Sequence, residues 1–322
     1  MVSCRRRFSS KLALAAILCL CAVTGLLAQS ARKLTLASEV EAYFQDWGGS
    51  FLPRWSGHAL LGPVLGDGSH VWVITKDGQR EDVRFTFPGA GWITIVGASR
   101  RPDGALALIG AAASSDSQMG RFVAWISPDR TRQAVVRVTP YSPKTVTFAP
   151  DGTFWTAGEM SATEYDVLWH FDDSGRKLGS SVRRSTVRGG MPAAGSHLNA
   201  SRDRIGWYTG WGSAGTGEYI EVAPNGEMID RFPGVPLPPH AGWRPRAAAL
   251  SENNDVIVDM KNSGNGAEWI YALDRVNRSW VPLQLPDGQS YPVVAGFEGN
   301  NLVFRAASKR IRFYKLPGPA TR

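Results

Sequence analysis

A short turn motif recurs along this chain at an almost constant interval. Residues 101–104 read Arg-Pro-Asp-Gly and residues 149–152 read Ala-Pro-Asp-Gly, and weaker copies end at Asp203, Asn254 and Asn300. The last residues of these turns are 48, 51, 51 and 46 residues apart. Asp, Pro, Gly and Asn are the residues that tight turns require, because Pro presets φ and Gly or Asn accepts a positive φ. The chain is therefore built from units of about 50 residues.

A second turn motif runs in phase with the first, and strands are predicted between the two. Its copies occupy residues 75–78, 127–130, 172–175, 223–226 and 274–277. Within one unit, strands are expected at residues 144–149, 153–158, 166–171 and 177–183. Val167, Trp169 and Phe171 alternate with other residues at the period of two that is typical of a strand. Four short strands per unit of about 50 residues predict an all-β β-propeller with about six four-stranded blades. A β-sandwich also has many short strands, but it needs no such repeat.

The predicted blades cover most of the chain as a single domain, residues 31–316. They span residues 43–90, 92–141, 143–194, 195–241, 244–288 and 291–315, and residues 317–322 form a short tail. The last blade has only three strands of its own, so an N-terminal strand at residues 33–36 is expected to supply the fourth and close the ring. Seven blades remain an alternative if residues 31–60 hold a further unit. The 12 tryptophans are expected to lie mostly between blades.

The first 30 residues have the pattern of a secretory signal peptide. Arg5, Arg6, Arg7 and Lys11 precede a run of apolar and small residues from 12 to 27, and small residues follow it. A retained membrane anchor is the alternative, although the run is short for a span of about 20 residues. All three cysteines lie in this segment, so a mature chain without it would have no thiol or disulfide. We therefore expect a secreted or periplasmic monomer with no membrane span after cleavage.

The best copy of the repeat resembles those of known propeller families. Residues 148–155 read Phe-Ala-Pro-Asp-Gly-Thr-Phe-Trp and are similar to NHL-type, gluconolactonase-type and streptogramin-lyase-type repeats. The lactonase resemblance implies a divalent cation held by Glu, Asn and Asp in the channel. This chain has Lys, His and Arg at the matching positions, with Asn199 as the one plausible polar ligand. No metal and no cofactor is therefore predicted.

The long and varied loops of this repeat are expected on one face of the propeller, opposite the tight turns, and loops carry most binding residues. Basic and aromatic side chains enter the inner strands from that face, which favours an anionic or carbohydrate ligand, or a protein partner. The net charge of +8 falls to +4 without the first 30 residues, so nucleic acid is not indicated. The candidate ligand-binding residues are Trp92, Lys144, His197, Trp211, Trp243, Arg244, Arg246 and Tyr291.

Motifs for catalysis are mostly missing from the sequence. It contains neither Gly-x-Ser-x-Gly nor His-Glu-x-x-His. His197 and His240 are the histidines expected on the loop face, and they are the candidates for a general base or a metal-assisted step. The sequence thus favours a non-catalytic ligand-binding or partner-binding protein. A metal-assisted hydrolase or lyase and a structural module of an envelope complex remain alternatives.

Overall fold

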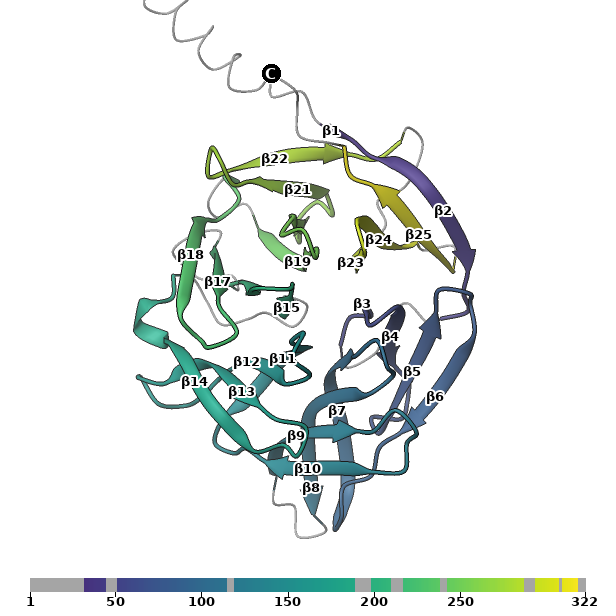
Figure 1. Ribbon diagram of the computed structural model, residues 1–322, viewed down its shortest axis with the longest axis vertical. Coiled ribbons are helices and arrows are strands. Elements are labelled where there is room, and N and C mark those ends of the chain that lie inside the picture. Colours follow the sequence, from purple (N-terminus) through teal and green to yellow (C-terminus); the bar gives the residue numbers. More distant parts are fainter. Residues whose placement is uncertain are drawn as a thin grey trace, which may run out of the picture.

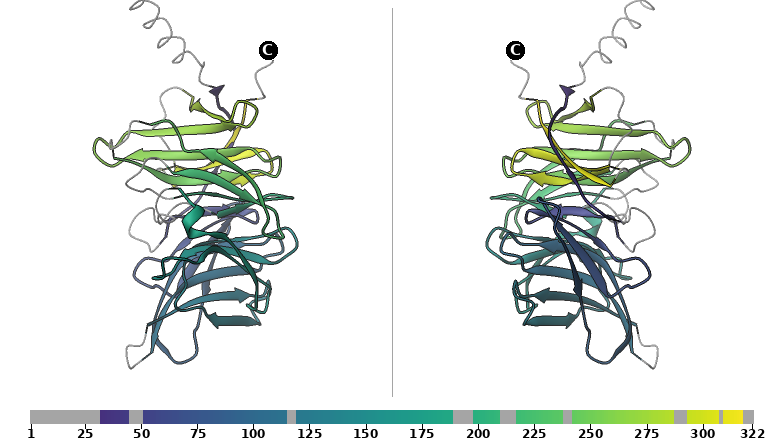
Figure 2. Two further views of the ribbon diagram at one scale, coloured as in Figure 1. Left: turned by 90° about the vertical axis from the view of Figure 1, so that its left-hand side faces the viewer. Right: turned by 90° about the vertical axis from the view of Figure 1, so that its right-hand side faces the viewer.

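The described strands form a ring of blades around a central axis. The computed structural model describes residues 32–44, 51–114, 119–188, 198–209, 217–237, 242–286, 293–306 and 309–317. Figure 1 looks down the axis and shows the blades following one another around the ring, and Figure 2 shows the ring from the side. Within the described residues, six antiparallel blades of four strands confirm the predicted propeller and its blade count.

Each blade runs from an inner strand beside the axis to an outer strand at the rim. Blade 1 contains β3 (Arg54–Ser56), β4 (Ala59–Pro63), β5 (His70–Thr75) and β6 (Arg80–Arg84). Blade 2 contains β7 (Ala90–Arg100), β8 (Leu106–Ser114), β9 (Met119–Ile126) and β10 (Gln133–Arg137). Blade 3 contains β11 (Ser142–Phe148), β12 (Phe154–Glu159), β13 (Asp166–Phe171) and β14 (Lys177–Arg183), followed by a short 3-10 helix, η1 (Arg184–Thr186).

The other three blades complete the ring. Blade 4 contains β15 (Leu198–Ala200), β16 (Ile205–Tyr208), β17 (Glu218–Val222) and β18 (Met228–Pro233). Blade 5 contains β19 (Trp243–Leu250), β20 (Val256–Asn262), β21 (Glu268–Asp274) and β22 (Ser279–Gln284). Blade 6 contains β23 (Val293–Glu298), β24 (Asn301–Ala306) and β25 (Arg310–Lys315).

The N-terminal segment closes the ring, as the sequence predicted. β2 (Thr35–Glu41) pairs antiparallel with β25 and is the outer strand of blade 6, with Thr35 opposite Lys315. β1 (Arg32–Lys33) pairs in parallel with β22 and adds a fifth strand to blade 5. The closing strand therefore extends further along the chain than the predicted residues 33–36. Because both strands cover blade edges, they protect backbone groups that would otherwise be open to another chain.

The hydrophobic core lies between neighbouring blades. Successive side chains of a strand point to opposite faces, and β8 shows the result clearly. Leu106 and Leu108 pack against blade 1, whereas Ala107 and Ile109 pack against blade 3. Seven of the twelve tryptophans are buried in the described structure, in agreement with their predicted place between blades: Trp55, Trp72, Trp125, Trp155, Trp207, Trp243 and Trp280.

Small residues allow the inner strands to approach one another near the axis. At Gly296, on the inner strand of blade 6, an added Cβ would lie 2.8 Å from the carbonyl oxygen of Trp55 in blade 1. A side chain at this position would therefore push the first and last blades apart. No helix in the described part of the chain is long and apolar enough to cross a membrane. The predicted signal peptide lies outside the described residues.

Candidate functional site

An axial cavity of about 480 Å³ opens on the face that carries the tight turns. On this tight-turn face, each inner strand turns into the second strand of its blade. The lining comes from the inner strands and turns of all six blades, including residues 54–58, 100–102, 147–150, 199–202, 250, 252 and 297–299. The predicted site lies on the opposite loop face. Residues 189–197, 210–216, 238–241 and 287–292, which include several of the predicted loops, lie outside the described residues.

Arg54 forms part of the cavity lining and reaches across the axis. It lies on β3, and only 5% of its surface is exposed. The edge of an inner strand that faces the axis has no neighbouring strand, so its carbonyl groups need other donors. The Arg54 guanidinium donates to the carbonyl oxygen of Val146 in blade 3 at 2.5 Å and to that of Leu198 in blade 4 at 3.0 Å. A third contact reaches Asn199 Oδ1 at 3.5 Å. One side chain thus links blades 1, 3 and 4.

The positive charge of Arg54 has no carboxylate partner among the described residues. Its Nε is buried and makes no hydrogen bond to any residue that the structure describes. Burial lowers the pKa of Arg54 to about 10, which still leaves the guanidinium protonated at neutral pH. A buried charge without a counter-charge is costly. The cavity therefore has a floor that favours a negative group.

The charged groups at the rim of the cavity are largely paired with one another. Glu298 accepts a hydrogen bond from Trp55 Nε1 at 2.9 Å, and His58 Nδ1 lies 2.9 Å from both of its carboxylate oxygens. Arg101 pairs with Asp103 at 2.6 Å. Arg100, which also lines the cavity, donates to the carbonyl oxygen of Gly57 and forms no ion pair with a described carboxylate. Arg54 and Arg100 therefore make the lining of the cavity electropositive.

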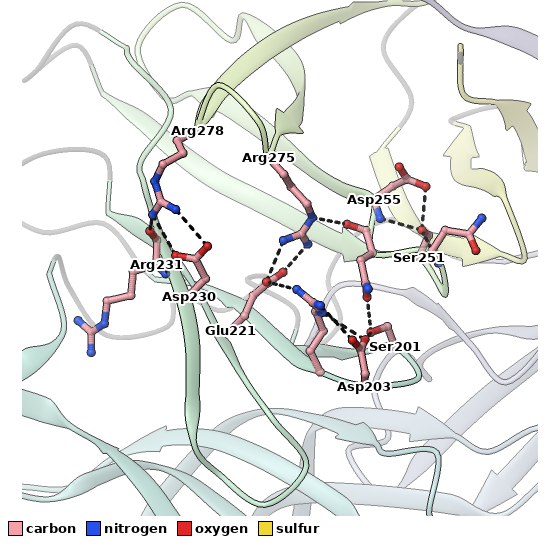
Figure 3. Close-up of polar contacts among 12 residues, drawn as sticks. Ser201, Asp203, Glu221, Asp230, Arg231, Ser251, Asp255, Arg275 and Arg278 are labelled. Carbon is pink, nitrogen blue, oxygen red and sulfur yellow. Dashed lines mark hydrogen bonds and ion pairs between the residues drawn. The ribbon is translucent and has the colours of Figure 1, made fainter. Parts of the chain in front are cut away.

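A network of ion pairs between blades 4 and 5 supports one wall of the cavity (Figure 3). Glu221 on β17 is fully buried and accepts from Arg204 at 2.9 Å and from Arg275 at 2.9 and 2.5 Å. The Arg275 side chain also donates to the Asn254 carbonyl. Asn254 Oδ1 in turn accepts from the hydroxyl of Ser201, which lines the cavity. The network therefore fixes the positions of the tight turns of blades 4 and 5 relative to each other.

Two of the basic residues predicted on the loop face, Lys144 and Arg246, lie close to carboxylates from other strands of their own blades. Lys144 on β11 pairs with Glu159 on β12 at 2.5 Å. Arg246 on β19 pairs with the fully buried Asp259 at 2.8 Å and with Glu268 at 2.6 Å. Burial raises the pKa of Asp259, and the charge of Arg246 opposes this shift. These carboxylates lie on other strands of the same blades, so the pattern of the inner strands alone did not reveal them.

The predicted aromatic residues on the loop face have different surroundings. Trp243 is buried and packs on Trp269, with ring centroids 4.9 Å apart. Trp92 is 49% exposed on β7, and Arg244 is exposed at the start of β19. The predicted residues His197, Trp211 and Tyr291 lie outside the described residues, and so does the second catalytic candidate, His240.

The described residues contain no group of three or more His, Cys, Asp or Glu side chains that could hold a metal ion. Asn199, the polar residue considered for a lactonase-type ligand set, donates to the carbonyl of Ala248 and lies beside Arg54. Its surroundings are therefore cationic, which is unfavourable for a divalent cation. Sequence reasoning missed Arg54 itself, because it lies in the least regular copy of the repeat.

Comparisons with known proteins show similar folds at low sequence identity. No protein-family model matches the chain, and no curated protein sequence matches it. A gluconolactonase from Xanthomonas campestris has 13% identity over 90% of this chain and 99% of its own, with a TM-score of 0.49. A protein of unknown function from Bacteroides caccae has 14% identity over 78% of this chain and 82% of its own, with a TM-score of 0.48.

A third similar structure is an oligogalacturonate lyase in complex with manganese. It has 12% identity over 81% of this chain and 74% of its own, with a TM-score of 0.48. Similarities this distant do not indicate what this chain binds or whether it catalyses a reaction.

Proposed function

We propose that this propeller is a non-catalytic binding protein that takes a small anionic ligand into its axial cavity. The observation that carries the proposal is the buried Arg54, a cation beside the cavity with no carboxylate partner in the described structure. The volume of the axial cavity, about 480 Å³, lies within the range of roughly 300–1,000 Å³ that is usual for small-molecule sites.

The ligand chemistry follows from the charge and the depth of the site. A carboxylate or phosphate group in the cavity would lie near the buried Arg54 guanidinium. At a separation of about 7 Å and an effective dielectric constant of about 20, this attraction is worth roughly 2 kcal/mol. The paired groups at the rim, such as Glu298 with His58, limit the repulsion that the ligand meets on entry. The proposed ligand site therefore lies on the tight-turn face, whereas the sequence predicted a site on the loop face.

Export of the protein is part of this proposal, on the sequence pattern of residues 1–30. An exported chain would meet its ligand outside the cytoplasm. N-terminal sequencing of the protein recovered from its source would show whether the segment is removed. A mature chain that begins near residue 30 agrees with this part of the proposal, and an intact N-terminus argues for the retained anchor.

A screen of matched anions and neutral analogues tests the binding function. The purified protein is titrated with acetate, succinate, citrate and inorganic phosphate, and with succinamide as the neutral partner of succinate. Binding is followed by the shift in thermal unfolding, since a ligand that binds only the folded state raises its stability. At least one anion should raise the melting temperature at constant ionic strength, and succinamide should not. A shift with succinamide as large as the largest shift with any anion, or no shift with any anion, would refute the proposal.

A further inference from the structure

A second cavity, of about 520 Å³, lies on the loop face at blades 1 and 2, away from the axial cavity. The loop between β4 and β5 forms one side of it, and the segment from the end of β6 to the start of β7 forms the other. The lining spans residues 66–69, 84–87 and 90–93, all of which the structure describes. None of these residues belongs to the axial cavity.

Trp92 gives this cavity an exposed aromatic surface. The residue is 49% exposed, and it has neither an aromatic partner nor a cation–π partner among the described residues. Most other tryptophans of the described structure are buried between blades, as the packing of the ring requires. An indole ring combines an apolar face with a polar N–H, so it suits a ligand that is apolar on one side and polar at its edges.

The polar side chains at the cavity include one cation and one anion. Arg84 is exposed and has no ion pair or hydrogen-bond partner among the described residues. Asp67 accepts hydrogen bonds from the backbone N–H and the hydroxyl of Ser69 and pairs with His70 at 2.7 Å. These hydrogen bonds lower the pKa of Asp67, with the largest effect from the Ser69 hydroxyl, and they keep the carboxylate charged. The site therefore offers donors and an acceptor without a strong excess of either charge.

The backbone around the cavity is also accessible. An added Cβ at Gly66 or Gly91 would meet no atom within 4 Å, so both glycines border open space. A ligand with several hydroxyl groups can use such exposed peptide groups as well as Arg84 and Asp67. A simple anion would be attracted by Arg84 but would meet the charge of Asp67.

We propose that this cavity is a glycan-binding site for a neutral sugar unit that stacks on Trp92. The apolar face of the sugar ring packs on the indole, and its hydroxyl groups accept from Arg84 and donate to Asp67. This site is separate from the axial cavity, and it does not depend on the anion-binding function. The proposal places two ligand sites on opposite faces of the same propeller.

The test measures binding of neutral and acidic sugars to variants of the full chain. Maltotetraose, cellotetraose and chitotetraose serve as neutral probes in isothermal titration, and glucuronate serves as the acidic probe. At least one neutral tetrasaccharide should bind, Trp92→Ala should weaken it at least tenfold, and Arg84→Gln should weaken it several-fold. Trp269→Ala is the matched control, because Trp269 is 47% exposed in blade 5 and should leave the affinity unchanged.

Each result decides the proposal. Circular dichroism of Trp92→Ala establishes that the variant is folded, and the exposure of this side chain predicts that it is. The proposal is overturned if no neutral tetrasaccharide binds at millimolar concentration, or if Trp92→Ala binds as well as the unaltered protein. Tighter binding of glucuronate than of every neutral probe would also overturn it, in favour of an acidic sugar.

Discussion

Replacement of Glu221 by Gln tests whether the buried ion pairs between blades 4 and 5 stabilise the ring. The side chain is fully buried, and its carboxylate accepts three hydrogen bonds from two arginines. Glutamine has nearly the same size, so the change removes the negative charge and leaves little cavity. Loss of one partner of a buried ion pair typically costs about 3–5 kcal/mol.

The loss of stability expected for Glu221→Gln lies near the lower end of that range. The side chains of Arg204 and Arg275 are 18% and 29% exposed, so water can recover part of their hydration. Arg204 also retains Asp203 at 3.0 Å, and Arg275 retains the Asn254 carbonyl. We therefore expect a loss of about 3 kcal/mol, which is roughly a 100-fold change in the unfolding equilibrium.

Urea unfolding followed by circular dichroism measures this loss, with Glu252→Gln as the matched control. Glu252 lies on the same face and pairs with Arg202 at 3.5 Å, but its side chain is 59% exposed. An exposed pair contributes about 0–1 kcal/mol, so the control should change stability very little. If Glu221→Gln and Glu252→Gln lose the same small amount, the network does not stabilise the contact between the blades.

Two further predictions concern acid stability and packing at the axis. The hydrogen bond from Arg204 is the main cause that lowers the pKa of Asp203 to about 2, against roughly 3.9 in an unfolded chain. Its contribution to stability is therefore fully present well above pH 4 and is lost as the pH falls toward 2. Melting temperatures between pH 6 and pH 2 should fall less steeply for Asp203→Asn than for the unaltered protein, and parallel curves would refute this. Gly296→Ala should cost about 1–3 kcal/mol in urea unfolding, because the new Cβ would meet the Trp55 carbonyl at 2.8 Å. Gly179→Ala, where an added Cβ meets nothing within 4 Å, is its control, and equal stability of the two variants would contradict the proposed crowding.

The architecture was predictable because it repeats locally. Each unit contains its own turn signals, and residues such as Gly104 and Gly152 do adopt the positive φ that the turns require. The closing strand was predictable for a different reason. The last blade lacks an outer strand, and an unpaired edge needs a partner, which β2 supplies.

The axial site was not predictable, because it depends on contacts between distant parts of the chain. Arg54 and Leu198 are 144 residues apart and meet only when the ring closes. A repeat pattern gives the order of blades, but it does not tell which side chain crosses the axis. The partners of Lys144 and Arg246 could have been predicted more easily. Glu159 and Asp259 lie on the strands that pair directly with the strands of Lys144 and Arg246.

Titration calorimetry of Arg54→Met is the measurement that tests the anion-binding account most directly. The anion that stabilises the protein most in the screen is titrated into the unaltered protein, into Arg54→Met and into Arg54→Lys. Arg176→Met is the control for net charge, because Arg176 is 76% exposed and lies outside the cavity lining. Thermal unfolding of each variant is recorded, since Met leaves the carbonyls of Val146 and Leu198 without their donor.

The account predicts that Arg54→Met weakens anion binding at least tenfold, in line with an attraction of roughly 2 kcal/mol. Arg54→Lys keeps the positive charge and should retain most of the affinity, and Arg176→Met should retain all of it. Equal affinity in the unaltered protein and a folded Arg54→Met, or an equal loss in Arg54→Met and Arg176→Met, would contradict an axial anion site.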